Sequence, residues 1–341
     1  MSRDLPVRDA VVTLFHLPLE CGQTLPRVKV HYRLEGALSA ARDNVVLIAH
    51  ALTGTTAASE WWKGVVGDGA AIDPIRHAVL SANLLGGCDG TTGPSLDQAD
   101  ALPPITTRDQ ALVLARLLDQ LGIETPQLVC GGSLGGMVTL EFAASYPERV
   151  RRAVAFAAPA VQTAQGIAWN ALMRRALDLG GTTDGFALAR MIGMLSYRTP
   201  EGLEARFAND IAADGTPEVT SWMEAHGRKL VARFDPVSYR ALIDAMDRHD
   251  VGRGRGSVTA ALAPVANRLI GVGIPGDLLY PDSAVRAWTE SAGASLALLD
   301  SPHGHDAFLL ERVQVAAILR HALSDAPSPS TPRAPAPPSP A

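Results

Sequence analysis

Ser133 is the residue best placed for covalent chemistry, because it is the centre of the pentapeptide GGSLG at residues 131–135. An apolar run that reads as a buried strand precedes it at 126–130, and a helix-like segment follows at 138–144. A G-x-S-x-G turn between a strand and a helix exposes the serine hydroxyl beside helix amides that favour negative charge. This pattern predicts a nucleophile for acyl transfer, although a serine that only caps the helix would also fit a glycine-rich turn.

A serine nucleophile of this kind needs a base, which follows it in the order serine, acid, histidine. His303 and His305 both lie in the loop after the last apolar run, 295–299, and a helix is expected to begin near Ala307. His305 is the predicted base, because a residue just before that helix can place its imidazole over Ser133. His303 is then an ordinary loop residue.

The acid that orients the histidine is predicted at Asp277. This residue follows the apolar run 268–274, and loops at the carboxyl ends of parallel strands are where such sheets hold their sites. Asp282 falls at an expected helix cap, and Asp300 and Asp306 share the loop of the histidine itself. Asp277 therefore remains the strongest of four candidates.

Two backbone amides are predicted to stabilise the oxyanion. One belongs to Leu134, directly after the nucleophile, and the other to Leu52, in the loop that follows the apolar strand 44–49. Loss of one such donor typically costs about 2.7 to 4 kcal/mol of transition-state stabilisation. The loop alone does not exclude an ordinary polar turn that begins at His50.

The segment GGCDGTTGP at residues 86–94 resembles a signature of the homoserine O-acetyltransferase family, a branch of the α/β-hydrolase fold. Further blocks are similar to that family in the same order: HALTG at 50–54, GGSLGGM at 131–137, RFD at 233–235 with SY at 238–239, and GHDAF at 304–308. Ordinary esterases share only the serine turn and the triad. Because the first block begins at residue 50 and the last ends at 308, the resemblance extends over residues 50–308 and is specific to this family.

The resemblance implies an α/β-hydrolase fold with Ser133, Asp277 and His305 as the triad. It also implies that Arg174 holds the carboxylate of an amino-acid acceptor and that Asp306 receives its amino group, as a guanidinium and a carboxylate can. Without the resemblance, Arg174 beside Arg175 would be interpreted as a solvated helix face. The implied reaction is ping-pong transfer from acyl-CoA, with no bound cofactor, in methionine biosynthesis by a homodimer.

Some residues depart from the family pattern, notably Leu134, where many members have Met, the segment 55–58, and Gly276 before Asp277. These changes leave the triad intact. The resemblance favours acetyl-CoA with L-homoserine, the commonest pairing in the family, and the changes leave succinyl-CoA as donor and L-serine as acceptor open as alternatives. A plain esterase with the same triad and a ligand-binding relative without turnover are the alternatives of other classes.

Composition favours a cytoplasmic enzyme that acts on small molecules. The 341 residues carry a net charge of −5 without a basic run, which argues against a nucleic-acid partner. The first nine residues contain acids where a signal peptide would be positive, and no stretch is long enough to cross a membrane. Three scattered cysteines predict no disulfide framework, and no spacing of the nine histidines indicates a metal site.

The chain is predicted to form a core with one insertion. Residues 1–158 and 265–322 supply the strands and the catalytic loops. Residues 159–264 show helical periodicity with few strand-like runs, which predicts a helical lid. The tail 323–341 is rich in Pro, Ala and Ser and is predicted to be disordered.

Overall fold

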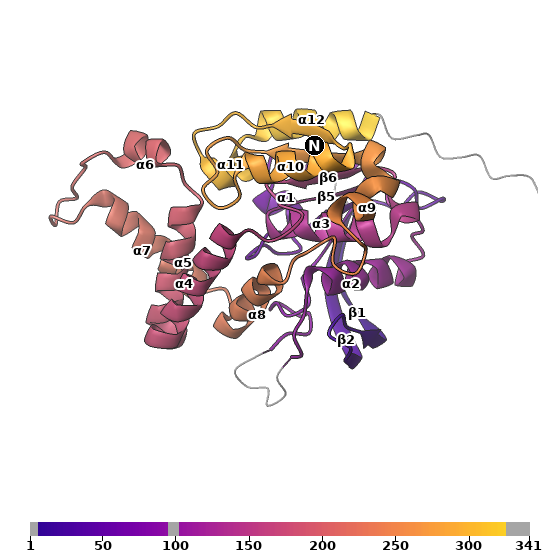
Figure 1. Ribbon diagram of the computed structural model, residues 1–341, viewed down its shortest axis with the longest axis horizontal. Coiled ribbons are helices and arrows are strands. Elements are labelled where there is room, and N and C mark those ends of the chain that lie inside the picture. Colours follow the sequence, from indigo (N-terminus) through magenta and orange to yellow (C-terminus); the bar gives the residue numbers. More distant parts are fainter. Residues whose placement is uncertain (1–5, 95–101, 325–341) are drawn as a thin grey trace, which may run out of the picture.

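A single sheet of eight strands organises the computed structural model, which describes residues 6–94 and 102–324 (Figure 1). The strand order is β1-β2-β4-β3-β5-β6-β7-β8. The hairpin β1–β2 joins β4 in antiparallel fashion, and the pairs from β4 through β3 to β8 are parallel. The strands are β1 (Val7–Pro18), β2 (Thr24–Glu35), β3 (Val45–Ala49), β4 (Ala78–Ala82), β5 (Leu128–Gly132), β6 (Ala153–Phe156), β7 (Leu269–Gly273) and β8 (Ser295–Leu298).

Helices cover both faces of the sheet, and alternate residues of the central strands serve the two faces. Leu47 of β3 belongs to one buried cluster, whereas Val46 and Ile48 belong to the other. Because side chains alternate along a strand, a run that is apolar at every position is buried on both sides. One face carries α2 (Thr107–Gln120), α3 (Leu134–Ser145) and α10 (Asp282–Ala292); the other carries α1 (Ala58–Trp61), α11 (Ala307–Leu310) and α12 (Arg312–Ser324).

The lid is the chain between β6 and β7. Figure 1 shows α4, α5, α6 and α7 projecting to one side of the sheet, with α8 nearer to it. The lid helices are α4 (Ala164–Gly180), α5 (Phe186–Ser196), α6 (Pro200–Phe207), α7 (Glu218–Val231), α8 (Pro236–Asp247) and α9 (Val258–Leu262). A single π turn (Gly181–Gly185) separates α4 from α5. None of the helices in the described ranges is long and apolar enough to span a bilayer.

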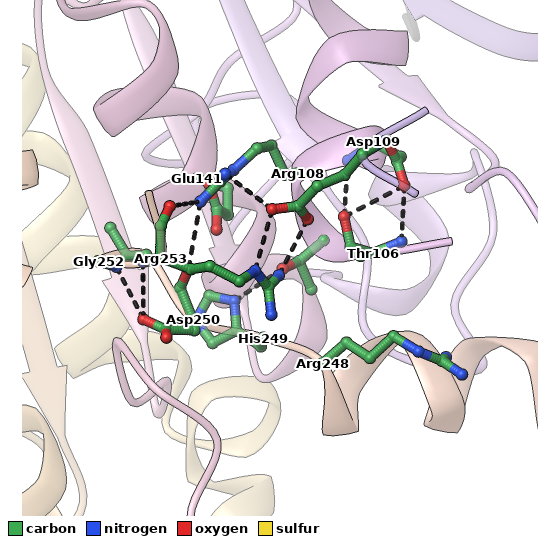
Figure 2. Close-up of polar contacts among 12 residues, drawn as sticks. Thr106, Arg108, Asp109, Glu141, Arg248, His249, Asp250, Gly252 and Arg253 are labelled. Carbon is green, nitrogen blue, oxygen red and sulfur yellow. Dashed lines mark hydrogen bonds and ion pairs between the residues drawn. The ribbon is translucent and has the colours of Figure 1, made fainter. Parts of the chain in front are cut away.

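The base of the lid is tied to the core by a group of ion pairs. Glu141 of α3 has a fully buried side chain, and one of its oxygens contacts Arg108 at 3.2 Å and Arg255 at 2.8 Å. Glu20 contacts Arg108 at 2.7 Å and Arg253 at 2.9 Å. Figure 2 shows Arg108 and Glu141 beside the chain that returns from the lid. We name these five residues the base network.

His249 joins the same region from within. It is 1% exposed, its Nδ1 accepts from the Thr107 hydroxyl at 2.7 Å, and its Nε2 donates to the Pro159 carbonyl at 3.0 Å. These roles suit one neutral tautomer. Burial lowers the pKa of His249 to about 4, so the imidazole is neutral at pH 7.

The observed boundaries correct one expectation and add a detail within the lid. Helix α12 continues to Ser324, so residues 323 and 324 belong to the core and not to a tail. The remainder of the predicted tail, 325–341, lies outside the described residues. Within the region of helical periodicity, residues 164–196 form two helices, because glycines at both ends of the segment Gly181–Gly185 accommodate a break that an apolar pattern does not reveal.

Candidate active site

Ser133 occupies a strained turn between β5 and α3. Its φ is 57° and its ψ −124°, a region that residues with a side chain rarely adopt. A Cβ at Gly135 would lie 2.0 Å from the Ala49 carbonyl oxygen, and one at Gly131 would lie 2.5 Å from it. The two flanking glycines therefore let the turn pack directly on β3. This packing holds the serine at the N-terminus of a twelve-residue helix.

His305 and Asp277 form a buried pair. His305 Nδ1 lies 2.6 Å from Asp277 Oδ2, and the other carboxylate oxygen accepts from the amides of Leu279 at 2.8 Å and Tyr280 at 2.9 Å. An aspartate held by two amides fixes both the orientation and the tautomer of the imidazole. Among the described residues, His305 Nε2 is buried and no protein group forms a hydrogen bond with it, so no other side chain occupies this nitrogen.

Aromatic side chains enclose the imidazole of His305. The ring centroids of Tyr197, Tyr280 and Phe308 lie 5.6, 5.4 and 5.8 Å from that of His305. Gly132 makes room for Phe308, because a Cβ there would be 2.4 Å from the phenyl ring. These contacts limit rotation of His305 and keep water from most of its surface.

The two predicted oxyanion donors lie at the start of α3 and in the loop after β3. Leu134 is the first residue of α3, and the leading amides of a helix have no intrahelical acceptor. Leu52 follows β3 and is buried. The loop around it is fixed by His50, whose Nε2 accepts from the Leu84 amide at 3.3 Å, and by Arg233, which donates to the Thr53 carbonyl at 2.9 Å.

Neither His50 nor Cys88 has the properties of a rival catalytic group. Burial lowers the pKa of His50 to about 4, and its Nδ1 lies 2.7 Å from the Ala51 carbonyl. Burial raises the pKa of the Cys88 thiol, which disfavours the reactive thiolate. No group of three potential metal ligands occurs in the described ranges of the chain.

The structure does not bring Arg174 and Asp306 into contact. Arg174 lies in α4, and its Nη1 contacts Asp244 at 3.0 Å and Asp247 at 2.6 Å. Asp306 instead pairs with Arg198, at 2.8 Å. A guanidinium that already lies between two carboxylates is a poor receptor for a third.

Arg190 and Arg198 are the cations that the sequence interpretation missed. Arg190 lies on α5 with its guanidinium 5.6 Å from the ring centroid of Tyr197, which in turn packs on His305. Its positive charge opposes the rise that burial causes in the pKa of Tyr197. The spacing of seven residues between Arg190 and Tyr197 places both on one helix face and is the signal that could have indicated the pair.

The fold and this constellation place the chain in the α/β-hydrolase class. The sequence pattern of the family described as alpha/beta hydrolase fold matches residues 44–195. A homoserine O-acetyltransferase of Thermus thermophilus is 44% identical over 88% of this chain and 87% of the relative. The chain therefore belongs to the homoserine O-acetyltransferase family and is an enzyme of that type.

Two solved structures show how widely this architecture is shared. The homoserine O-acetyltransferase of Staphylococcus aureus superimposes with a TM-score of 0.81 at 28% identity, over 93% of this chain and 95% of that one. Esterase E22 superimposes with a TM-score of 0.83 at 21% identity, over 93% of this chain and 100% of that one. At 21% identity, the match to esterase E22 shows the fold alone. One fold can host different reactions, as the names esterase and acetyltransferase of these two proteins illustrate.

Proposed function

We propose that this enzyme transfers the acetyl group of acetyl-CoA to the hydroxyl of L-homoserine through an acetylated Ser133. The observation that carries the proposal is the strained Ser133 in the same molecule as a His305–Asp277 pair whose free nitrogen has no other partner, in a member of this family. The reaction belongs to methionine biosynthesis in the cytoplasm.

The first half-reaction forms the acyl-enzyme. His305 Nε2 takes the proton of Ser133 Oγ as the oxygen attacks the thioester carbonyl, and Asp277 stabilises the resulting imidazolium. The amides of Leu52 and Leu134 stabilise the oxyanion. CoA then leaves as a thiol with the proton from His305. No bound cofactor takes part, because the thioester already carries an activated acyl group.

In the second half-reaction the acceptor hydroxyl replaces the thiol. His305 removes the proton of the hydroxyl as its oxygen attacks the acyl carbonyl on Ser133. The bond between Ser133 Oγ and the acyl carbon then breaks, His305 returns the proton to Ser133 Oγ, and the O-acetylated amino acid leaves. Arg190, which has no ion-pair partner in the described parts of the chain, holds the carboxylate of the amino acid. Asp306 holds its ammonium through Oδ1, because Arg198 contacts only Oδ2. The role first expected of Arg174 passes to Arg190, because Asp244 and Asp247 already neutralise Arg174.

Transfer must compete with hydrolysis by water. A positioned hydroxyl can reach an effective molarity of about 10⁵ M or more, which exceeds the concentration of liquid water. Transfer therefore outcompetes hydrolysis if the closed site also excludes water. The burial of Ser133, Asp277 and His305, at 6%, 3% and 3% exposure, supports such closure. An esterase of the same fold would lack this dependence on an acceptor.

The alternatives concern substrates. Succinyl-CoA and L-serine fit the same chemistry, and one methylene is discriminated by only about 1 to 3 kcal/mol. Small-molecule substrates, without nucleic acid or membrane as partners, agree with the net charge of −5.

A homodimer is supported by apolar side chains on the outside of the lid. Exposed leucines and an isoleucine lie on α4 and α5, and Leu179 is 72% exposed. They are Ile167, Leu172, Leu179, Leu188 and Leu195. Paired apolar helix faces are a common way to bury such a surface in a second copy. Light scattering during size exclusion should give twice the mass of one chain, and a mass of one chain would contradict the dimer.

The function is tested by thiol release from acetyl-CoA and succinyl-CoA, each with L-homoserine, with L-serine and without acceptor. We expect release that depends on L-homoserine, prefers acetyl-CoA and disappears in Ser133→Ala. Equal release without acceptor would instead identify a hydrolase. Failure of Ser133 to react with a fluorophosphonate would favour a binding protein without turnover.

A further inference from the structure

We propose that Arg206 and Lys229 of the lid form a phosphate-binding subsite for the nucleotide half of the acyl-CoA donor. The inference rests on the proposed use of a CoA thioester and adds the place where its phosphates bind. The two residues belong to a group of cations on α5, α6, α7 and the turn between α5 and α6. We name Arg190, Arg198, Arg206 and Lys229 the lid cation group.

Aromatic side chains hold part of this group in place without neutralising it. The Arg206 guanidinium lies 4.9 Å from the ring centroid of Phe207 and 5.4 Å from that of Trp222. Arg198 lies 5.8 Å from the Trp222 ring centroid. A cation over a ring is restrained but keeps its charge and its N–H donors, so it stays available to an anion.

Carboxylates do not balance these charges. Asp306 pairs with Arg198, whereas Arg190, Arg206 and Lys229 have no carboxylate within ion-pairing distance in the described ranges. The charges converge on His226, whose pKa is lowered to about 4 by burial and then by the charges of Arg190, Lys229, Arg198 and Arg206. In a chain of net charge −5, cations gathered at one place indicate an anionic ligand.

The group is continuous with the catalytic centre. Arg198 contacts Asp306, the residue next to His305, and Arg190 lies over Tyr197, which packs on His305. Arg206 is exposed on α6 and Lys229 is exposed on α7, farther along the same group. The pantetheine arm of CoA separates its thioester from its phosphates. A donor bound at Ser133 therefore needs phosphate contacts beyond the catalytic residues, where these two cations lie.

Another hollow on the molecule has cations but suits phosphate less well. A cavity of about 590 Å³ is lined by Arg27 and Lys29 of β2 and by the loop 87–94. Asp89 and Asp235 also line it, and their charges would repel a phosphate. The lid cation group therefore remains the better site, and Arg27→Gln/Lys29→Gln is a matched comparison with the same loss of charge.

The test measures donor kinetics in Arg206→Gln/Lys229→Gln with acetyl-CoA and with S-acetyl-pantetheine, which lacks the nucleotide. We expect KM for acetyl-CoA to rise about tenfold from the loss of two charge-assisted contacts, with kcat within about twofold of wild type. kcat/KM for S-acetyl-pantetheine should not change. The control is Arg228→Gln, an exposed cation on α7 that pairs with Glu224, for which we expect wild-type KM.

An unchanged KM for acetyl-CoA, an equal loss with S-acetyl-pantetheine, or a tenfold rise in Arg27→Gln/Lys29→Gln alone would overturn the proposal. Calorimetric titration with free CoA separates this inference from the proposed reaction, because binding needs no turnover. Weaker CoA binding in the double variant supports the subsite even if no acceptor is found. Equal CoA affinity in wild type and variant contradicts it even in an active transferase.

Discussion

The two ends of the lid handle charge in opposite ways. At its base, Glu20 and Glu141 are each shared by two arginines. The carboxylate of Glu141, which Figure 2 shows beside Arg108, is fully buried. At its outer end, the four cations of the lid cation group have one carboxylate partner among the described residues, Asp306, which pairs with Arg198. Charges that are balanced within the protein hold the lid, whereas unbalanced charges remain available to substrates.

The difference follows from the cost of burying charge. A buried carboxylate without a partner is strongly unfavourable, so Glu141 is stable only because Arg108 and Arg255 contact it. Exposed cations carry no such penalty, since water solvates them until a ligand arrives. Substitutions at the base of the lid should therefore lower the free energy of unfolding. Substitutions at the outer end of the lid and in the catalytic centre should instead change kcat or KM.

The largest kinetic effect is expected from Asp277→Asn. The amide has the shape of the carboxylate but favours the wrong tautomer of His305 and cannot stabilise its imidazolium, so kcat should fall about 10⁴-fold. Steady-state kinetics at saturating substrates measures the change. Thermal unfolding by circular dichroism serves as the control for folding. A loss of less than about tenfold in a folded variant would argue against the triad.

At the base, Glu141→Gln should show the opposite pattern. It removes a buried charge from between Arg108 and Arg255 and leaves Arg255 without a carboxylate, while Arg108 keeps Glu20, and we expect this to cost about 3 kcal/mol of unfolding free energy. Chemical denaturation measures this cost, and kcat/KM of the folded fraction should stay near that of wild type. Arg206→Gln is the matched variant at the other end, with an expected change in stability below about 0.5 kcal/mol. Equal destabilisation by the two variants would remove the distinction between the ends.

Two arginines of the lid can be compared directly. Arg190→Gln should raise KM for the amino acid about tenfold or more, through loss of a charge-assisted contact with its carboxylate. Arg174→Gln should change that KM by less than about threefold, because Asp244 and Asp247 already occupy its guanidinium. Acceptor kinetics at saturating donor measure both variants. The reverse order would restore the role first predicted for Arg174.

The smallest expected effect is a pH dependence of stability, which comes from His249 at the base of the lid. His249 is neutral in the folded protein, with a pKa of about 4, whereas an unfolded histidine titrates near 6.5. Below 6.5 the unfolded chain binds a proton that the folded chain does not. The contribution of neutral His249 to the free energy of unfolding is thus fully present above pH 6.5 and declines toward pH 4. At pH 5.5 about 1.4 kcal/mol of it has been lost. His50 acts in the same direction.

Denaturation curves at pH 7.5 and 5.5 measure how much His249 contributes to the pH dependence of the free energy of unfolding. In His249→Gln the difference in unfolding free energy between the two pH values should shrink by about 1.4 kcal/mol, whatever the variant does to stability at pH 7.5. A pH dependence equal to that of wild type would show that His249 does not titrate in this window.

The order of strand, sharp turn and helix around Ser133 was predictable from short apolar runs and glycines, and the α/β-hydrolase fold that the family resemblance implied is confirmed. Asp277 and His305 could be chosen because each follows a strand in the expected order, and the structure places them in contact. Such loops converge by topology alone, since carboxyl ends of parallel strands meet at one edge. Sequence order therefore carries most of the information on the catalytic pair.

The lid was less predictable, because helical periodicity does not say which helix faces the site. Arg174 and Arg190 both lie on amphipathic helices. Only packing shows that Arg174 meets Asp244 and Asp247, and that Tyr197, beside Arg190, packs on His305. The break at Gly181–Gly185 was hidden for the same reason. Contacts between distant helices, such as Arg198 with Trp222, depend on tertiary structure that no local pattern encodes.

The central claim is that Ser133 carries the acyl group between donor and acceptor. Its most direct test is mass spectrometry of the protein mixed with acetyl-CoA in the absence of an acceptor, followed by addition of L-homoserine. We predict one acetyl group on the peptide that contains Ser133, lost rapidly when L-homoserine is added and slowly in water alone. An unmodified Ser133, or an adduct that water removes as fast as L-homoserine does, would contradict the claim.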